Sequence, residues 1–162
     1  MGNSIVIAEP TADGAACAVM ALRASGSTPD TFFVSSQKLA DLFSSGTPGR
    51  SSASPSVIIC GLGVVHTSWD GRVLRPHLMQ SLRDIASPIR WFSPRRWRSE
   101  DRTAVANIIG VERLVVAPDS SCAAELIADF YAGQMGEDAK ALVQMAGGKG
   151  NGSAPDCVGR WR

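Results

Sequence analysis

Short runs of apolar residues alternate along this chain with segments in which apolar residues recur at helical spacing. Five stretches are predicted strands because they are short, apolar and mostly β-branched: 4–8, 31–34, 57–65, 89–92 and 114–117. Five alanine-rich or amphipathic stretches are predicted helices: 15–23, 37–43, 73–85, 99–109 and 121–131. This alternation predicts an α/β fold, a three-layer sandwich with a mostly parallel sheet of about five strands.

The predicted elements belong to one domain. The continuously apolar stretch 57–65 predicts the central strand, covered on both faces. The stretch 44–56 is rich in Ser, Gly and Pro and predicts a surface loop rather than a domain boundary. We expect the domain at residues 1–135 and a Gly-rich tail at 136–162. Serines are expected to cap three of the helices: Ser35-Ser36, Ser99, and Ser120 or Ser121.

Composition excludes several classes of protein. The chain has 162 residues, of which 44% are hydrophobic and 19% charged, and its net charge is +1, which excludes an extended disordered chain. No apolar run reaches the roughly 20 residues that span a bilayer, and no leader is evident, so we expect a cytoplasmic protein without membrane contact. The four cysteines lie far apart and are expected to be small core residues rather than a zinc or redox site.

Ligands of open α/β sheets bind at the carboxyl ends of the strands, so the residues just after each apolar run are the candidates for chemistry. These include Glu9, Asp13, His66 and Asp119. Asp13 is a metal ligand or, more commonly for a lone aspartate before a helix, a cap. His66 is a ligand, an acid–base group or simply a loop histidine.

Arginines and aromatic residues are concentrated between residues 90 and 102. Arg95, Arg96 and Arg98 lie there together with Trp97, and Trp91 and Phe92 precede them. Guanidinium groups bind phosphate in bidentate fashion and aromatic faces stack on bases, so the segment suits a nucleic acid, a nucleotide or an acidic protein surface. The alternative is a solvated loop whose tryptophans anchor it to the core.

The Gly-rich tail is a second candidate for anion binding. Gly148, Lys149 and Gly150 have the composition of a loop that cradles phosphate, although the order is not that of a P-loop and no strand directly precedes it. The alternative is a flexible linker.

The order of these elements resembles the N-terminal domain of the DHH phosphoesterase superfamily over residues 4–132. The segment EPTADGAACAVMAL stands where the family has its first motif, with Asp13 and Gly14 matching it. APDSSCAAELIADFY resembles the last motif and places Asp119 at its aspartate. The segment GGKGNGSAPDCVG resembles a remnant of the family's Gly-rich substrate loop.

Other positions depart from the family pattern. Glu9 and Thr11 replace the first motif's His and Asp, Cys60 replaces the aspartate of the central strand, and Ser93-Pro94-Arg95 stands at the DHH signature. The resemblance therefore implies a fold that grips phosphodiesters, in which Asp13 and Asp119 alone are left as candidate ligands for manganese or magnesium. Because two carboxylates do not hold two ions, we expect no cofactor and no catalytic residues.

The resulting prediction is a catalytically degenerate DHH-like domain that binds phosphate, nucleic acid or protein as a subunit, as a homo-oligomer or within a larger complex. Replacing Arg95 and Arg96 with alanine is then expected to weaken partner binding with little change in the fold.

Two alternatives stay open. The first is a phosphodiesterase that uses Asp13, Asp119, Glu9 and His66 around one manganese or magnesium ion. The second is a purely structural subunit, in which the isolated chain would expose apolar aromatic surface: Trp91, Phe92, Trp97 and Trp161.

Overall fold

The computed structural model describes residues 4–25, 29–45, 56–133 and 138–147. Five parallel strands form its sheet, in the order β2-β1-β3-β4-β5, as the alternating pattern predicts. Their bounds are β1 Ile5–Ala8, β2 Asp30–Phe33, β3 Val57–Cys60, β4 Ile89–Ser93 and β5 Leu114–Val116. The chain order reverses between β1 and β3, and in such sheets this reversal opens a crevice at the carboxyl ends of the strands.

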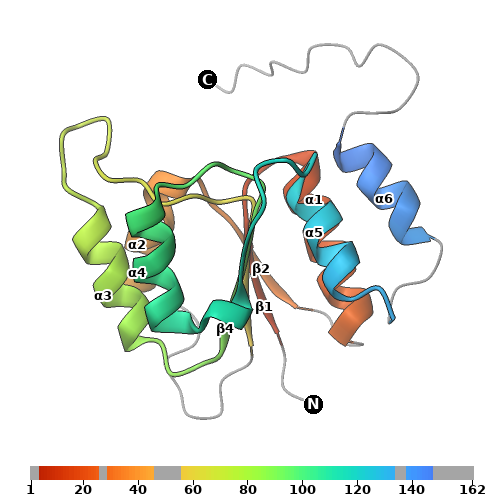
Figure 1. The fold of residues 1–162 in the computed structure, drawn as a ribbon, viewed down its shortest axis with the longest axis horizontal. Coiled ribbons are helices and arrows are strands. Elements are labelled where there is room, and N and C mark those ends of the chain that lie inside the picture. The colour runs from red at the N-terminus through yellow and green to blue at the C-terminus, as the bar shows by residue number, and fades with distance from the viewer. Residues whose placement is uncertain (1–3, 26–28, 46–55, 134–137, 148–162) are drawn as a thin grey trace.

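Helices cover both faces of the sheet and complete a three-layer α/β sandwich (Figure 1). One layer holds α2 Leu39–Ser44, α3 Arg75–Asp84 and α4 Ser99–Ile109, and the other holds α1 Ala12–Ser25, α5 Ala123–Phe130 and α6 Asp138–Ala146. Two short 3₁₀ helices, Ser36–Lys38 and Val111–Arg113, precede α2 and β5.

Each face of the sheet has its own hydrophobic cluster because successive strand side chains point to opposite faces. In β3, Val57 and Ile59 pack toward α2, α3 and α4, whereas Ile58 and Cys60 pack toward α1 and α5. All four side chains are buried, which is the physical reason for the unbroken apolar run in the sequence.

The predicted central strand is too long. β3 ends at Cys60, since Gly61 has φ of +76°, a left-handed conformation that takes the chain out of the sheet. The apolar residues that follow line a loop at the carboxyl edge, and of these Leu62 is fully buried. The apolar run therefore continues past the strand because the loop also packs on the core.

The predicted serine caps are wrong in their detail. Ser35 precedes a 3₁₀ turn and makes no capping hydrogen bond through its side chain. Ser99 is the first residue of α4, not its cap. Helix α5 starts at Ala123, one or two residues later than predicted, and the N-cap residue, Cys122, makes no capping bond through its own side chain. Its N-terminal amides are bound instead by a carboxylate from another helix.

Three of the cysteines are buried and free, which confirms their prediction as core residues: Cys17, Cys60 and Cys122. The pKa of the Cys17 thiol is raised far above its ordinary range, mainly by a hydrogen bond with Cys60 and secondly by burial. Cys157 and the predicted phosphate-binding residues Gly148, Lys149 and Gly150 lie outside the described residues, as does Trp161. No helix in the described part of the chain is long and apolar enough to cross a membrane.

Candidate functional site

Residues that follow β1, β3 and β4 meet at the carboxyl edge of the sheet. The guanidinium of Arg95 forms an ion pair with Glu9, and its Nε donates to the carbonyl of Gly61 at 2.7 Å. Arg95 thus crosses the point between β1 and β3 at which the strand order reverses. The sequence predicts both residues as candidates, and the structure brings them together.

Asp13 is a cap, but for a helix other than its own. Its two carboxylate oxygens accept hydrogen bonds from the backbone amides of Ala123 and Ala124, at 2.9 and 2.8 Å. Those amides belong to the first turn of α5, where no intrahelical acceptor exists. Asp13 therefore joins the start of α1 to the start of α5 across 110 residues of chain.

The metal ligands that the resemblance implies do not fit a two-metal centre. Glu9 is paired with a guanidinium, and both oxygens of Asp13 accept backbone hydrogen bonds. Asp119 is exposed in the turn before α5 and has no ion pair among the described residues. A cation here would have to displace Arg95 and uncap α5, so we derive no step through manganese or magnesium.

His66 takes part in a different cluster. Its Nε2 lies 2.7 Å from Oδ2 of Asp101, and Arg75 Nε donates to Oδ1 of the same carboxylate at 2.6 Å. Asp101 is 2% exposed. Burial works to raise the pKa of the Asp101 carboxyl, but the hydrogen bonds from Arg75 and His66 outweigh it and hold the pKa below its ordinary value. Asp101 is therefore an ionised, buried carboxylate.

In the described part of the chain, the group of three metal-ligating side chains with ligand atoms within 4.8 Å of one another is His66, Glu100 and Asp101. Arg75 contacts the central carboxylate directly, so a positive charge already occupies the place of a cation. This geometry assigns Asp101 to an ion-pair cluster rather than to a metal site. The predicted set of Asp13, Asp119, Glu9 and His66 does not form such a group among the described residues.

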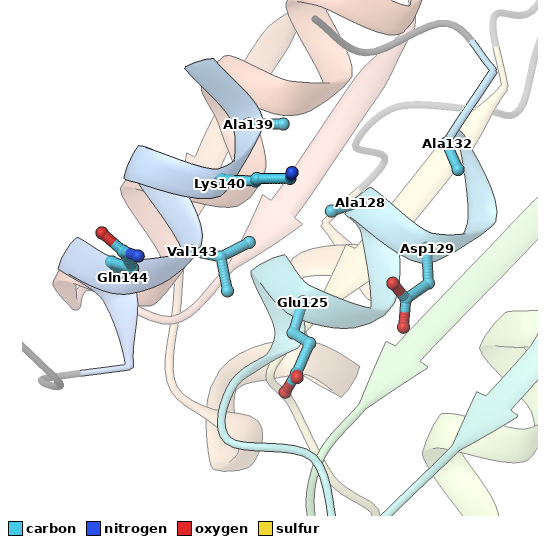
Figure 2. Close-up of a pocket in the computed structure, with 8 residues that line it drawn as sticks. All are labelled: Glu125, Ala128, Asp129, Ala132, Ala139, Lys140, Val143 and Gln144. Atoms are coloured by element: carbon cyan, nitrogen blue, oxygen red, sulfur yellow. The ribbon is translucent and has the colours of Figure 1, made fainter. Parts of the chain in front are cut away.

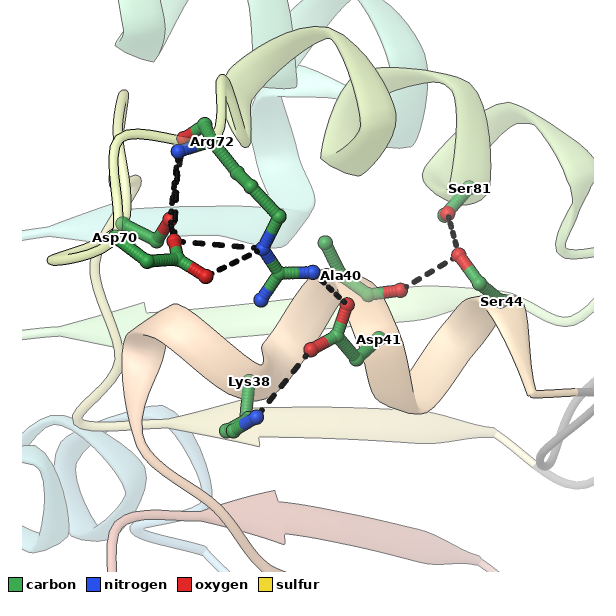
Figure 3. Close-up of polar contacts among 8 residues, drawn as sticks. Lys38, Ala40, Asp41, Ser44, Asp70, Arg72 and Ser81 are labelled. Atoms are coloured by element: carbon green, nitrogen blue, oxygen red, sulfur yellow. Dashed lines mark hydrogen bonds and ion pairs between the residues drawn. The ribbon is translucent and has the colours of Figure 1, made fainter.

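A polar network holds the turn that follows His66. Asp70 accepts hydrogen bonds from Ser68 and Arg72, and Arg72 also pairs with Asp41 of α2, which pairs in turn with Lys38 (Figure 3). The hydrogen bonds lower the pKa of the Asp70 carboxyl, and the bond from Ser68 has the largest effect.

At the base of this turn, the carbonyl of His66 accepts a hydrogen bond from the Leu74 amide at 2.8 Å. This bond ties the backbone of His66 to the residue that precedes α3. Trp69, in the same turn, is 87% exposed, which the sequence pattern does not indicate.

A cavity of about 530 Å³ lies beside these groups at the carboxyl edge, and we call it the arginine pocket. It is lined by Ser36, Gly63, Val64, Val65, His66, Thr67, Arg95, Arg96, Trp97, Arg98 and Asp101. The pocket therefore brings the predicted arginine–tryptophan segment together with His66. It also contains Ser36, which the sequence suggests only as a helix cap, and Asp101, which the sequence analysis does not single out.

The absence of a side chain at Gly63 allows Arg95 and Trp97 to pack closely against the backbone of the pocket wall. A Cβ there would lie 3.2 Å from Cδ of Arg95 and 3.7 Å from Nε1 of Trp97. The Gly63 amide donates to Ser36 Oγ at 3.0 Å, so the hydroxyl is already positioned at the wall. Trp97 donates to Ser93 Oγ at 3.1 Å and packs edge-on against Trp91, with 4.9 Å between ring centroids.

The aromatic residues of this segment are anchors of the core. Trp91 and Phe92 are fully buried, and Trp91 donates to the carbonyl of Leu62 at 3.0 Å. Trp97 is partly buried against the same cluster. Of the two alternatives for the tryptophans of this segment, burial favours anchoring in the core over stacking on a base. The expectation that Trp91 and Phe92 form an exposed apolar face of an isolated structural subunit is wrong, because the domain itself covers both rings.

A second cavity, of about 420 Å³, lies between α5 and α6 (Figure 2). Alanines 128, 132 and 139 and Val143 form its apolar lining, and Glu125, Asp129 and Lys140 are its charged residues. With two acidic side chains and one basic, it lacks the cationic character of the arginine pocket.

Comparison of the chain with protein-family models, with curated proteins and with solved structures returned no significant match. The resemblance to the DHH superfamily thus stays a prediction.

Proposed function

We propose that this protein binds a small phosphate-bearing ligand, of nucleotide size, in the arginine pocket. The observation that carries the proposal is the convergence of Arg95, Arg96 and Arg98 on one cavity at the carboxyl edge of a parallel sheet. The volume of about 530 Å³ falls within the range of small-molecule sites.

The three arginines differ in how firmly they are held. Arg95 is bound by Glu9 and the Gly61 carbonyl, which leave further N–H donors of its guanidinium for a ligand. Arg98 lies 3.8 Å from Glu100, with both side chains largely exposed, and such a pair is weak. Arg96 has no ion pair among the described residues. Arg96 is therefore the charge that a phosphate group would neutralise most directly.

The charge of the whole chain favours a small ligand over a long nucleic acid. Sixteen basic residues are balanced by fifteen acidic ones, so the chain has no large excess of positive charge to follow a phosphate backbone. A local cationic pocket in a nearly neutral protein suits a ligand with one or two phosphate groups.

Calorimetric titration with inorganic phosphate and with AMP tests this proposal. We expect saturable binding of both, weakened about tenfold or more by Arg96→Ala, because a hydrogen bond to a charged group contributes about 1.5–3 kcal/mol. Arg102→Ala is the matched control, since Arg102 is exposed on α4 but does not line the pocket. Equal weakening by the two substitutions, or no binding by the unmodified chain, would contradict the proposal.

The structure changes the choice of variant. Alanine at Arg95 removes the partner of Glu9 and the bond to Gly61, so this substitution disturbs the fold as well as the ligand site. Arg96→Ala separates binding from folding because Arg96 makes no such contacts within the described residues.

A further inference from the structure

We propose that His66, held by Asp101, is a general base in the arginine pocket, and that the protein hydrolyses a phosphate monoester there without a metal ion. This inference rests on the proposed binding of phosphate and adds a reaction to it. The geometry that carries it is the contact of the buried Asp101 carboxylate with the His66 imidazole, since both side chains line the cationic pocket.

The first step of the argument concerns the tautomer of His66. An ionised carboxylate only accepts hydrogen bonds, so Nε2, at 2.7 Å from Asp101, carries the proton of the neutral ring. The lone pair is then on Nδ1. Among the described residues Nδ1 has no hydrogen-bond partner, and the His66 side chain is 32% exposed, so this nitrogen is free to accept a proton.

The second step concerns the stability of the charged state. When His66 accepts a proton at Nδ1, the ring becomes positive beside a carboxylate that stays ionised. Arg75, on the other oxygen of Asp101, keeps that carboxylate fixed. The other charged groups of the pocket are Arg95, Arg96 and Arg98, with Glu9 and Glu100 as partners of two of them.

The third step is the reaction itself. A water molecule gives one proton to Nδ1 of His66 while its oxygen forms a bond to phosphorus. The bond between phosphorus and the leaving oxygen breaks, and its electron pair departs with that oxygen. His66 then returns the proton to solvent, so an aryl phosphate and water give an aryloxide, hydrogen phosphate and one proton. Arg96 stabilises the negative charge on the phosphoryl oxygens as it develops.

The experiment measures hydrolysis of p-nitrophenyl phosphate by the full chain in the presence of EDTA. The leaving p-nitrophenolate needs no proton, so a general base alone suffices. We expect turnover that persists in EDTA and falls about 100-fold or more in His66→Gln, the range for loss of a general base. Glutamine retains a donor for Asp101, which protects the fold. His77→Gln is the matched control because His77 is the other histidine of the chain, is exposed, and does not line the pocket.

Two further measurements separate the possible failures. Phosphate binding by His66→Gln, measured by calorimetry, is expected to persist. If the unmodified chain binds phosphate but shows no turnover, the role of His66 as a general base is overturned, whereas the binding proposal stands. If it does not bind phosphate, both fail. Turnover abolished by EDTA, or equal in the two glutamine variants, would also overturn the inference.

Two further tests concern the pair of Asp101 and His66. The second uses the unmodified chain and therefore does not depend on whether an Asp101 variant folds. In Asp101→Asn the pH profile of turnover should shift, since the imidazole loses its charged partner. Independently, diethyl pyrocarbonate should modify His66 of the unmodified chain at Nδ1, and saturating phosphate should slow this modification but not that of His77. Equal protection of the two histidines would contradict the placement of Nδ1 in the pocket.

Discussion

Asp13 illustrates how one residue type at one position serves two different chemistries. A carboxylate in the turn after the first strand is a metal ligand in the family that the sequence resembles, whereas here both oxygens bind the first amides of α5. A sequence pattern identifies the position but not the acceptor or donor that the fold brings to it. The partners of Asp13 are 110 and 111 residues away.

If Asp13 is structural, its removal destabilises the chain in the absence of any metal. We expect Asp13→Ala to lower the free energy of unfolding by about 1–2 kcal/mol, the effect of losing a helix cap, and Asp13→Asn to cost less because one oxygen acceptor remains. Urea denaturation in EDTA measures this. Asp129→Ala, on the exposed side of α5, should stay within about 0.5 kcal/mol. Unchanged stability of Asp13→Ala in EDTA would contradict the capping role.

Asp101 is the residue of the arginine pocket for which the sequence gives the least indication of its surroundings. It lies in the first turn of α4, where an acidic residue is explained by the helix dipole alone. The helical spacing indicates that Asp101 is buried, because Asp101, Val105 and Ile109 are four residues apart and form the buried stripe of α4. A carboxylate on a buried stripe requires partners. Its partners, His66 and Arg75, lie 35 and 26 residues earlier, so spacing does not identify them.

At the scale of elements, the pattern predicts the five strands and helices α1 to α5 but misses α6, Asp138–Ala146, which lies in the stretch expected to be a Gly-rich tail. It predicts the junctions between elements poorly. All five strands and their parallel arrangement follow from apolar runs that alternate with helices. The junctions depend on backbone geometry that hydropathy does not contain, as the early end of β3 at Gly61 shows. The junctions also form the arginine pocket, so the site is the part of the fold that sequence describes least completely.

The turn between β1 and α1 is a tight junction. The Thr11 amide donates to the Glu9 carbonyl at 2.8 Å, and the Gly14 amide donates to Thr11 Oγ1 at 3.2 Å. A Cβ on Gly14 would lie 2.0 Å from the carbonyl oxygen of Glu9, closer than real atoms approach. This turn sets the position of Glu9, and through it that of Arg95.

Gly14→Ala should therefore destabilise the fold by about 1–3 kcal/mol, the usual cost of forcing extra atoms into a packed site. Gly133→Ala is the matched control, because a Cβ at Gly133 meets nothing within 4 Å and should change stability by less than about 0.5 kcal/mol. Thermal unfolding distinguishes them, since 1 kcal/mol shifts the melting temperature of a chain of this size by about 2–4 °C. Equal melting temperatures would show that the turn relaxes to admit a side chain.

At the scale of the whole molecule, the sheet divides the core into two hydrophobic clusters that share the same strands. Ile58 and Ile59 are adjacent in β3 but belong to different clusters, the former with α1 and α5 and the latter with α2, α3 and α4. Their exposed fractions are 3% and 0%. A sheet with one solvated face would tolerate loss of one of these side chains, whereas a sandwich covered on both faces tolerates loss of neither.

Ile58→Ala and Ile59→Ala should each lower the free energy of unfolding by about 2–5 kcal/mol, the cost of emptying a buried isoleucine site. Val73→Ala, at a position 59% exposed, should cost far less. Denaturant titrations of the three variants should give single transitions with unchanged slopes, because both clusters pack on the same central strand and unfold with it. A small effect at Ile58 alone would mean that the layer of α1, α5 and α6 contributes little to stability.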